Sequence, residues 1–158
     1  MRTWTALSAS ALALALAVAG CGGGDELSTS SISKAAFIKE VDAICSKGNE
    51  RVEADFTVYA KKTNFTPDKI NKKVSEAEAA ELATTVLLPA VRQEAAAIRK
   101  LSVPSGDQER IEAMLDAIDE GIETTEKIPK AVLEETSVGF GVASRLAKEY
   151  GFQVCGSR

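Results

Sequence analysis

Apolar side chains recur at steps of three and four residues along most of the chain, which is the spacing of one face of an α-helix. The clearest run extends from Phe37 to Tyr59 and predicts a helix that begins after Ser33 as N-cap and continues to about Lys62. Within this run Gly48 takes the place of a larger side chain. It either allows a neighbouring helix to approach closely or is a weak point that the helix tolerates.

A second helix is predicted from Thr66 to Leu101, because Thr66-Pro67-Asp68 provides an N-cap, a first-turn proline and an acidic residue near the helix start. We expect a kink at Pro89, since proline has no N–H to donate to the carbonyl of Thr85. The expected apolar face comprises Ile70, Val74, Ala77 and Leu82 before the proline and Leu88, Val91, Ala95, Ile98 and Leu101 after it.

Two further helices are expected beyond the turn at 103–106. The third starts at Ser105 or Asp107 and ends or bends at Pro129, and the last ends before Gly151. The expected core positions are Ile111, Met114, Leu115, Ile118 and Ile122 on the third helix, and Phe140, Ala143, Leu146, Ala147 and Tyr150 on the last.

No segment of useful length alternates apolar and polar residues as a strand does, so the predicted fold class is all-α. Four helices with short connections favour antiparallel neighbours around one core. We therefore expect an antiparallel four-helix bundle with a kinked second helix over residues 32–158.

The first twenty residues form a short apolar run with Arg2 as their only charge, which is typical of a signal peptide. Val18-Ala19-Gly20-Cys21 matches the bacterial lipobox, so residues 1–20 are expected to be removed and Cys21 to carry the lipid. Two or more acyl chains hold a protein stably on a membrane. Residues 21–31 are rich in Gly and Ser and are expected to form a flexible tether. The alternative is a secreted protein in which Cys21 is incidental.

Once Cys21 is assigned to lipid, Cys45 and Cys155 remain as the possible pair in an exported, oxidising compartment. We expect a structural disulfide between them. A redox-active thiol pair is the alternative, but the Cys-x-x-Cys spacing of such pairs does not occur in the sequence.

The charge and composition exclude several classes of function. The 158-residue chain carries 23 acidic and 19 basic residues, and this negative balance argues against nucleic-acid binding. It contains no histidine, which excludes His-dependent catalytic triads, His-ligated zinc and His-containing di-iron sites. We expect no metal site and no cofactor.

Acidic residues form a row along one flank of the third predicted helix. Its members are Glu109, Glu112, Asp116, Asp119, Glu123 and Glu126. Arg92 and Arg99 occupy a similar shoulder of the second helix and are expected to pair with some of them. The row is either a solvated bundle face or a patch for a cation or basic partner.

No arrangement of residues in the sequence predicts catalysis. The acids of the third helix are expected to face outward, where nothing raises the pKa of one of them or excludes water, so a hydrolase is the least favoured hypothesis. Tyr59 and Tyr150 could in principle ligate haem iron, but both lie on apolar helical faces typical of core residues. We therefore predict no catalytic residue.

Several short motifs occur together in the chain: Val18-Ala19-Gly20-Cys21, Ile32-Ser33-Lys34-Ala35-Ala36-Phe37-Ile38, Ala43-Ile44-Cys45, Leu88-Pro89-Ala90, Val103-Pro104-Ser105-Gly106-Asp107, Leu146-Ala147-Lys148-Glu149-Tyr150-Gly151 and Val154-Cys155-Gly156. In this combination the chain resembles the small helical lipoproteins and secreted proteins of actinobacteria, a group to which no activity is attached. The resemblance implies a paired Cys45 and Cys155 and a cell-surface location, and it supplies no catalytic residue.

The leading functional hypothesis is a lipid-anchored, extracytoplasmic helical protein that serves as a non-catalytic binding or structural module of the cell envelope. Its expected partners are the membrane, through the lipid anchor, and an envelope protein or small molecule. The alternative hypothesis is a small-ligand carrier in which the kinked second helix opens a pocket in the bundle.

Overall fold

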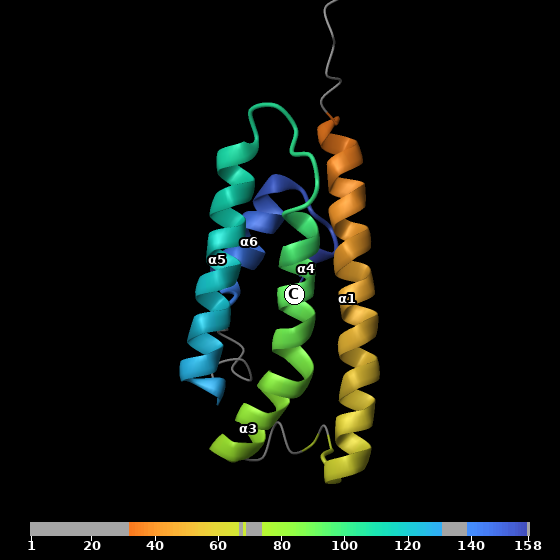
Figure 1. Cartoon of the computed structure of the whole chain (residues 1–158), viewed down its shortest axis with the longest axis vertical. Coiled ribbons are helices and arrows are strands. Elements are labelled where there is room, and N and C mark those ends of the chain that lie inside the picture. Colours follow the sequence, from red (N-terminus) through yellow and green to blue (C-terminus); the bar gives the residue numbers. More distant parts are fainter. Residues whose placement is uncertain (1–31, 67, 69–73, 131–138, 158) are drawn as a thin grey trace, which may run out of the picture.

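The computed structural model describes residues 32–66, 68, 74–130 and 139–157, and within these ranges the chain forms helices and no strand (Figure 1). This confirms the all-α fold class. The elements are α1 (Lys34–Thr63), α3 (Glu76–Leu82), the π-helical segment η1 (Ala83–Leu87), α4 (Leu88–Ile98), α5 (Gln108–Lys127), α6 (Gly141–Tyr150) and the 3₁₀ turn η3 (Cys155–Ser157). The expected signal peptide, the lipidated Cys21 and the tether lie outside the described residues.

Helix α1 begins and ends where its sequence indicates. The Ser33 hydroxyl accepts a hydrogen bond from the Ala36 N–H at 3.2 Å, as expected of an N-cap. The helix ends at Asn64, which adopts the left-handed conformation with φ 53°. Phe37 and Val41 are fully buried on its inner face. The predicted boundaries and apolar face of the first helix are therefore confirmed.

The second predicted helix is not continuous from Thr66. Val74 and Ser75 are not helical, and Ser75 caps a new helix, α3, through a capping box with Glu78. The Ser75 hydroxyl accepts from the Glu78 N–H, while the Glu78 carboxylate accepts from the Ser75 N–H at 3.0 Å. The prediction was wrong here because it took Thr66-Pro67 as the only helix start in this segment and missed the second start signal at Ser75. Ala77, an expected core residue, is exposed.

The interruption expected at Pro89 takes the form of a widened turn just before it. In η1 the N–H of Leu88 donates to the carbonyl of Ala83, five residues back, and α4 then continues the helix. Proline at position 89 has no N–H to donate, which breaks the regular hydrogen-bond ladder. The helix axis changes direction between α3 and α4 (Figure 1).

Helices α5 and α6 confirm the third and fourth predicted segments. Helix α5 follows Asp107 as N-cap and stops two residues before Pro129. Helix α6 ends at Gly151, whose φ of 117° suits glycine. The N–H groups of Gly151 and Phe152 both reach the Ala147 carbonyl, and this arrangement turns Phe152 back into the core.

The core is divided along the length of α1. The first half of α1 packs with α4, α5 and α6 in a cluster around Phe37, Met114 and Phe152. The second half of α1 packs with α3 and η1 in a second cluster around Tyr59 and Phe65. Helix α1 contacts α4 and η1, while α5 contacts α6 and α4. The first of these clusters borders the pocket described below.

Candidate functional site

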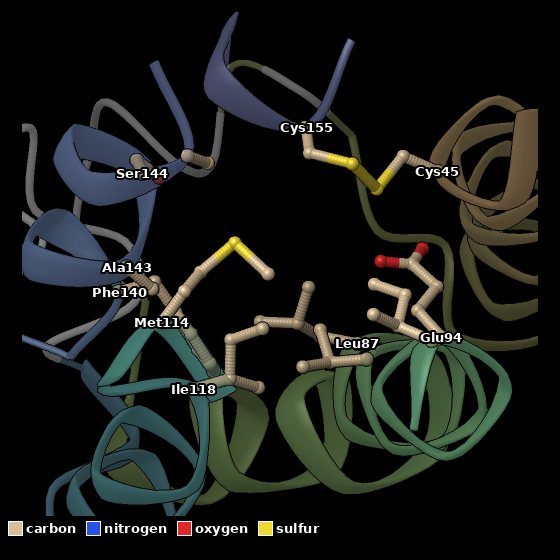
Figure 2. Close-up of a pocket in the computed structure, with 12 residues that line it drawn as sticks. Cys45, Leu87, Glu94, Met114, Ile118, Phe140, Ala143, Ser144 and Cys155 are labelled. Carbon is tan, nitrogen blue, oxygen red and sulfur yellow. A yellow bond between two sulfur atoms is a disulfide. The ribbon is translucent and has the colours of Figure 1, made fainter. Parts of the chain in front are cut away.

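A pocket of about 220 Å³ opens between α1, α4, α5 and α6. Figure 2 shows it bounded by the Cys45–Cys155 disulfide on one side and by α4 and α5 on the other. The residues that line it are Cys45, Leu87, Val91, Glu94, Ile98, Met114, Ile118, Phe140, Ala143, Ser144, Ala147 and Cys155. Most of these side chains are apolar.

The helical spacing of the sequence explains the floor of the pocket. Val91, Glu94 and Ile98 follow one another on α4 at steps of three and four residues, so they share one face. Leu87, the last residue of the π-helical segment, extends this face toward Ile118 of α5. The widened turn therefore contributes directly to the pocket, as the hypothesis of a kinked second helix requires.

Glu94 is the polar residue that distinguishes this pocket, and the sequence did not single it out. It is only 8% exposed, and its carboxylate is directed into the opening beside the disulfide (Figure 2). The carboxylate lies over Gly48 of α1, in the space that a β-carbon there would need. The expectation that Gly48 allows close approach of a neighbouring helix is confirmed, and α4 is that helix.

The disulfide forms the wall opposite α4 and α5. Cys45 on α1 and Cys155 after α6 are bonded, with their Cα atoms 5.5 Å apart, so the fold brings the predicted pair together. Cys45 is almost fully buried. The redox-active alternative has no support from the geometry, because neither sulfur lies at the start of an α-helix.

Asp42 fixes the chain that leads to Cys155, a role that the sequence did not indicate. Its carboxylate accepts hydrogen bonds from the backbone N–H groups of Gln153 at 3.0 Å, Val154 at 2.8 Å and Cys155 at 3.4 Å. Since a carboxylate is a strong acceptor, these contacts hold the tail against α1. Its position one turn before Cys45 on α1 is the only signal that the sequence offers.

The acidic row of α5 lies on the exposed surface and does not line the pocket. Two of its members form the expected pairs with α4: Arg92 with Glu126, and Arg99 with Asp119 at 2.5 Å. All four side chains are close to half exposed, so each pair contributes little to stability. Within the described part of the chain, no group of three or more potential metal-ligating side chains is found.

The two tyrosines considered as haem ligands lie in different core clusters, and neither lines the pocket. The Tyr150 hydroxyl donates to Asp107 Oδ2 at 2.7 Å, and burial together with this bond raises the pKa of the phenol. Burial and the nearby charge of Glu81 raise the pKa of Tyr59. The geometry therefore assigns both side chains to the packing of the core.

Comparison of the chain with protein-family profiles, with curated proteins and with solved structures found no match. The resemblance to actinobacterial lipoproteins stays a prediction. Among the helices described, none combines the length and apolar character needed to cross a membrane. The site must therefore be interpreted from its own chemistry.

Proposed function

We propose that the protein is a lipid-anchored, extracytoplasmic helical domain that binds a small, largely apolar molecule without transforming it. The pocket between α4, α5 and α6 is the observation that carries this proposal. A concave, mainly apolar site with one or two polar groups is the usual form of a small-molecule site. The pocket favours the carrier hypothesis over a purely structural role in the envelope.

The volume of the pocket limits the size of the ligand. An apolar cavity of roughly 150 Å³ is enough to bind benzene, and this pocket measures about 220 Å³. Typical sites for drug-sized molecules begin at roughly 300 Å³. The proposed ligand is therefore larger than benzene and smaller than most drugs, with about nine non-hydrogen atoms by simple scaling.

The proposed arrangement of the helices is an antiparallel four-helix bundle in which α3, η1 and α4 together form the second helix. Ligand sites in such bundles are built from side chains on facing helices in the core. The contacts of α1 with α4 and of α5 with α6 are compatible with this arrangement.

The proposed location rests on the sequence. The apolar leader and Val18-Ala19-Gly20-Cys21 favour removal of residues 1–20 and lipid attachment to Cys21. The tether would then hold the domain close to the outer face of the membrane, where it would meet molecules that enter or leave the envelope. We propose no nucleic-acid partner and no catalytic residue.

Thermal unfolding with small apolar probes tests ligand binding. Full-length protein in phospholipid nanodiscs is heated with toluene, ethylbenzene or 2-phenylethanol while its helical circular dichroism is followed. A ligand that binds only the folded state raises Tm in a saturable way. Ala143→Leu, which fills the pocket wall, should abolish the rise, whereas Ala96→Leu on the exposed face of α4 should keep it. No saturable rise with any probe would overturn the proposal.

A further inference from the structure

The sulfur atoms of the described residues gather at one place. Three sulfur-bearing residues, Cys45, Met114 and Cys155, lie in the described ranges, and all three line the pocket. They belong to three separate elements, α1, α5 and η3, so the packing of the helices brings them together. Figure 2 shows the thioether of Met114 extending from α5 into the opening, on the side that faces the disulfide. A ligand in the pocket therefore meets both the thioether and the disulfide.

An aromatic ring lines the same space. The ring of Phe140 lies against Gly121 of α5, and its Cδ1 and Cε1 atoms occupy the space that a β-carbon at position 121 would need. Phe140 also packs against the apolar cluster of Leu88, Val91 and Ile122. The absence of a side chain at Gly121 therefore lets the ring lie close to α5, where it forms part of the pocket wall.

Sulfur and aromatic neighbours distinguish an aromatic ligand from a saturated one. A polarisable sulfur atom is attracted to an aromatic ring, often at the ring edge. Two aromatic rings also attract one another in offset or edge-to-face arrangements. A saturated ring with the same carbon skeleton has no π-electrons, so it gains only the dispersion contacts that any hydrocarbon makes.

We propose that the pocket selects small molecules that contain an aromatic ring over saturated molecules of the same size, and that Met114 is the specificity-determining residue. The side chain of Met114 is unbranched and flexible, so its sulfur can adjust to the edge of a bound ring. The disulfide sulfurs are held in place, because they join α1 to the end of the chain. This inference rests on the proposed function.

Replacement of a single sulfur atom tests the role of Met114. Met114 is the only methionine in the sequence besides Met1, so production of the protein in a methionine auxotroph supplied with norleucine changes one side chain of the described domain. Norleucine keeps the length of the side chain and has a methylene group in place of the sulfur. The probes are 2-phenylethanol and 2-cyclohexylethanol, which share a carbon skeleton and differ in the aromaticity of the ring.

Dissociation constants are measured by isothermal titration calorimetry on the full-length protein in phospholipid nanodiscs, with the heat from empty nanodiscs subtracted. We expect 2-phenylethanol to bind about fivefold more weakly to the norleucine protein than to the wild type, because one contact between sulfur and the ring is lost. The affinity for 2-cyclohexylethanol should stay the same. Comparing the two proteins cancels the different tendencies of the probes to leave water or enter lipid, since these are properties of the probes alone.

Nuclear magnetic resonance locates the aromatic probe. With the methionine methyl groups labelled with carbon-13, the ring current of bound 2-phenylethanol should shift the Met114 signal, and 2-cyclohexylethanol should shift it much less. Ala96→Met adds a methyl group on the exposed face of α4, outside the pocket, and its signal should move with neither probe. If the norleucine protein does not fold, Met114→Leu, which also removes the sulfur, takes its place in the calorimetry.

The results distinguish failure of this inference from failure of the proposed function. If both probes bind and the loss of sulfur changes their affinities equally or not at all, the aromatic selectivity is overturned and the pocket remains an apolar binding site. Binding of 2-phenylethanol without a shift of the Met114 signal would likewise overturn the role of Met114. If neither probe binds, ligand binding itself is contradicted and both proposals fall.

Discussion

The carboxylate of Glu94 on α4 occupies the space that a side chain at position 48 on α1 would need. Glu94 is buried, and the glycine opposite it belongs to the apolar stripe of α1. The two residues are therefore coupled by packing: the absence of a side chain at position 48 of α1 makes room for the Glu94 carboxylate.

Gly48→Ala should change the free energy of unfolding by less than about 1 kcal/mol, because the new methyl group meets only the flexible side chain of Glu94, whose carboxylate can turn aside. The cost of displacing the carboxylate and the helix propensity gained on replacing glycine by alanine should nearly cancel. Urea unfolding followed by circular dichroism measures the change in the free energy of unfolding.

A double-mutant cycle provides the control for this prediction. In a Glu94→Ala background there is no carboxylate to displace, so Gly48→Ala should increase stability by about 1 kcal/mol through helix propensity alone. Additive effects of the two substitutions would show that they do not act on a shared contact, and would contradict the interpretation.

Replacing both Cys45 and Cys155 by alanine should lower the free energy of unfolding by about 2–4 kcal/mol. The disulfide joins residues separated by 110 positions, so its loss enlarges the range of conformations open to the unfolded chain. Differential scanning calorimetry of the oxidised wild type and the double variant measures the effect. The pairing would be refuted if the exported wild type contained free thiols and the double variant had the same Tm as the wild type.

Tyr150→Phe should lower stability at neutral pH by about 1–2 kcal/mol, because it removes the hydrogen bond donated to Asp107. The pKa of Tyr150 is raised on folding, so the folded protein keeps the phenolic proton at a pH where the unfolded chain has lost it. This contribution is complete below about pH 10 and is lost as the pH rises further.

The Tyr150→Phe variant should therefore lose less stability than the wild type between about pH 9 and about pH 11, a range centred on the ordinary pKa of tyrosine. Urea unfolding at several pH values measures both slopes. Because the phenylalanine ring can still receive the Lys34 ammonium that lies over the Tyr150 ring, that contact does not account for a difference. Parallel pH dependences would contradict the assignment.

Cys21→Ala should abolish lipid attachment. In a bacterial host that processes lipoproteins, the wild type should incorporate radiolabelled palmitate and sediment with membranes, because Cys21 is the last residue of a lipobox. Cys45→Ala should keep the label, since that residue belongs to the described domain. An unlabelled wild type in such a host would contradict the proposed anchor.

The sequence predicted the local features of the fold well because each depends on neighbouring residues. Ser33 as a cap and Gly151 as a helix end require only a hydroxyl or a glycine at the right position. Pairing of Arg92 and Arg99 with acids of the row was expected because their positions place them on the shoulder of the second helix; the structure identifies the partners as Glu126 and Asp119.

The sequence suggested a pocket only as an alternative hypothesis and could not predict its lining, because the polar residue Glu94 depends on a contact between distant segments. The sequence pattern alone does not distinguish Glu94 from the exposed acidic residues of a helix. Its burial depends on the packing of α4 against α1 at Gly48. The role of Asp42 likewise appears only when the end of the chain returns to α1. The break at Ser75 was available locally, as the capping box with Glu78, and was overlooked.

The bond between Cys45 and Cys155 closes the intervening chain, which includes α4, α5 and α6, into a covalent ring. The pocket lies beside this disulfide, and both cysteines line it. A proposed ligand therefore cannot enter by separation of α1 from the last residues of the chain, because the disulfide holds them together. Room has to come from the opposite wall, where the unbranched thioether of Met114 changes shape at little cost. One wall of the pocket is held by the Cys45–Cys155 disulfide and the other includes the flexible side chain of Met114. We therefore expect the pocket to accept ligands of different shape more readily than ligands of different volume.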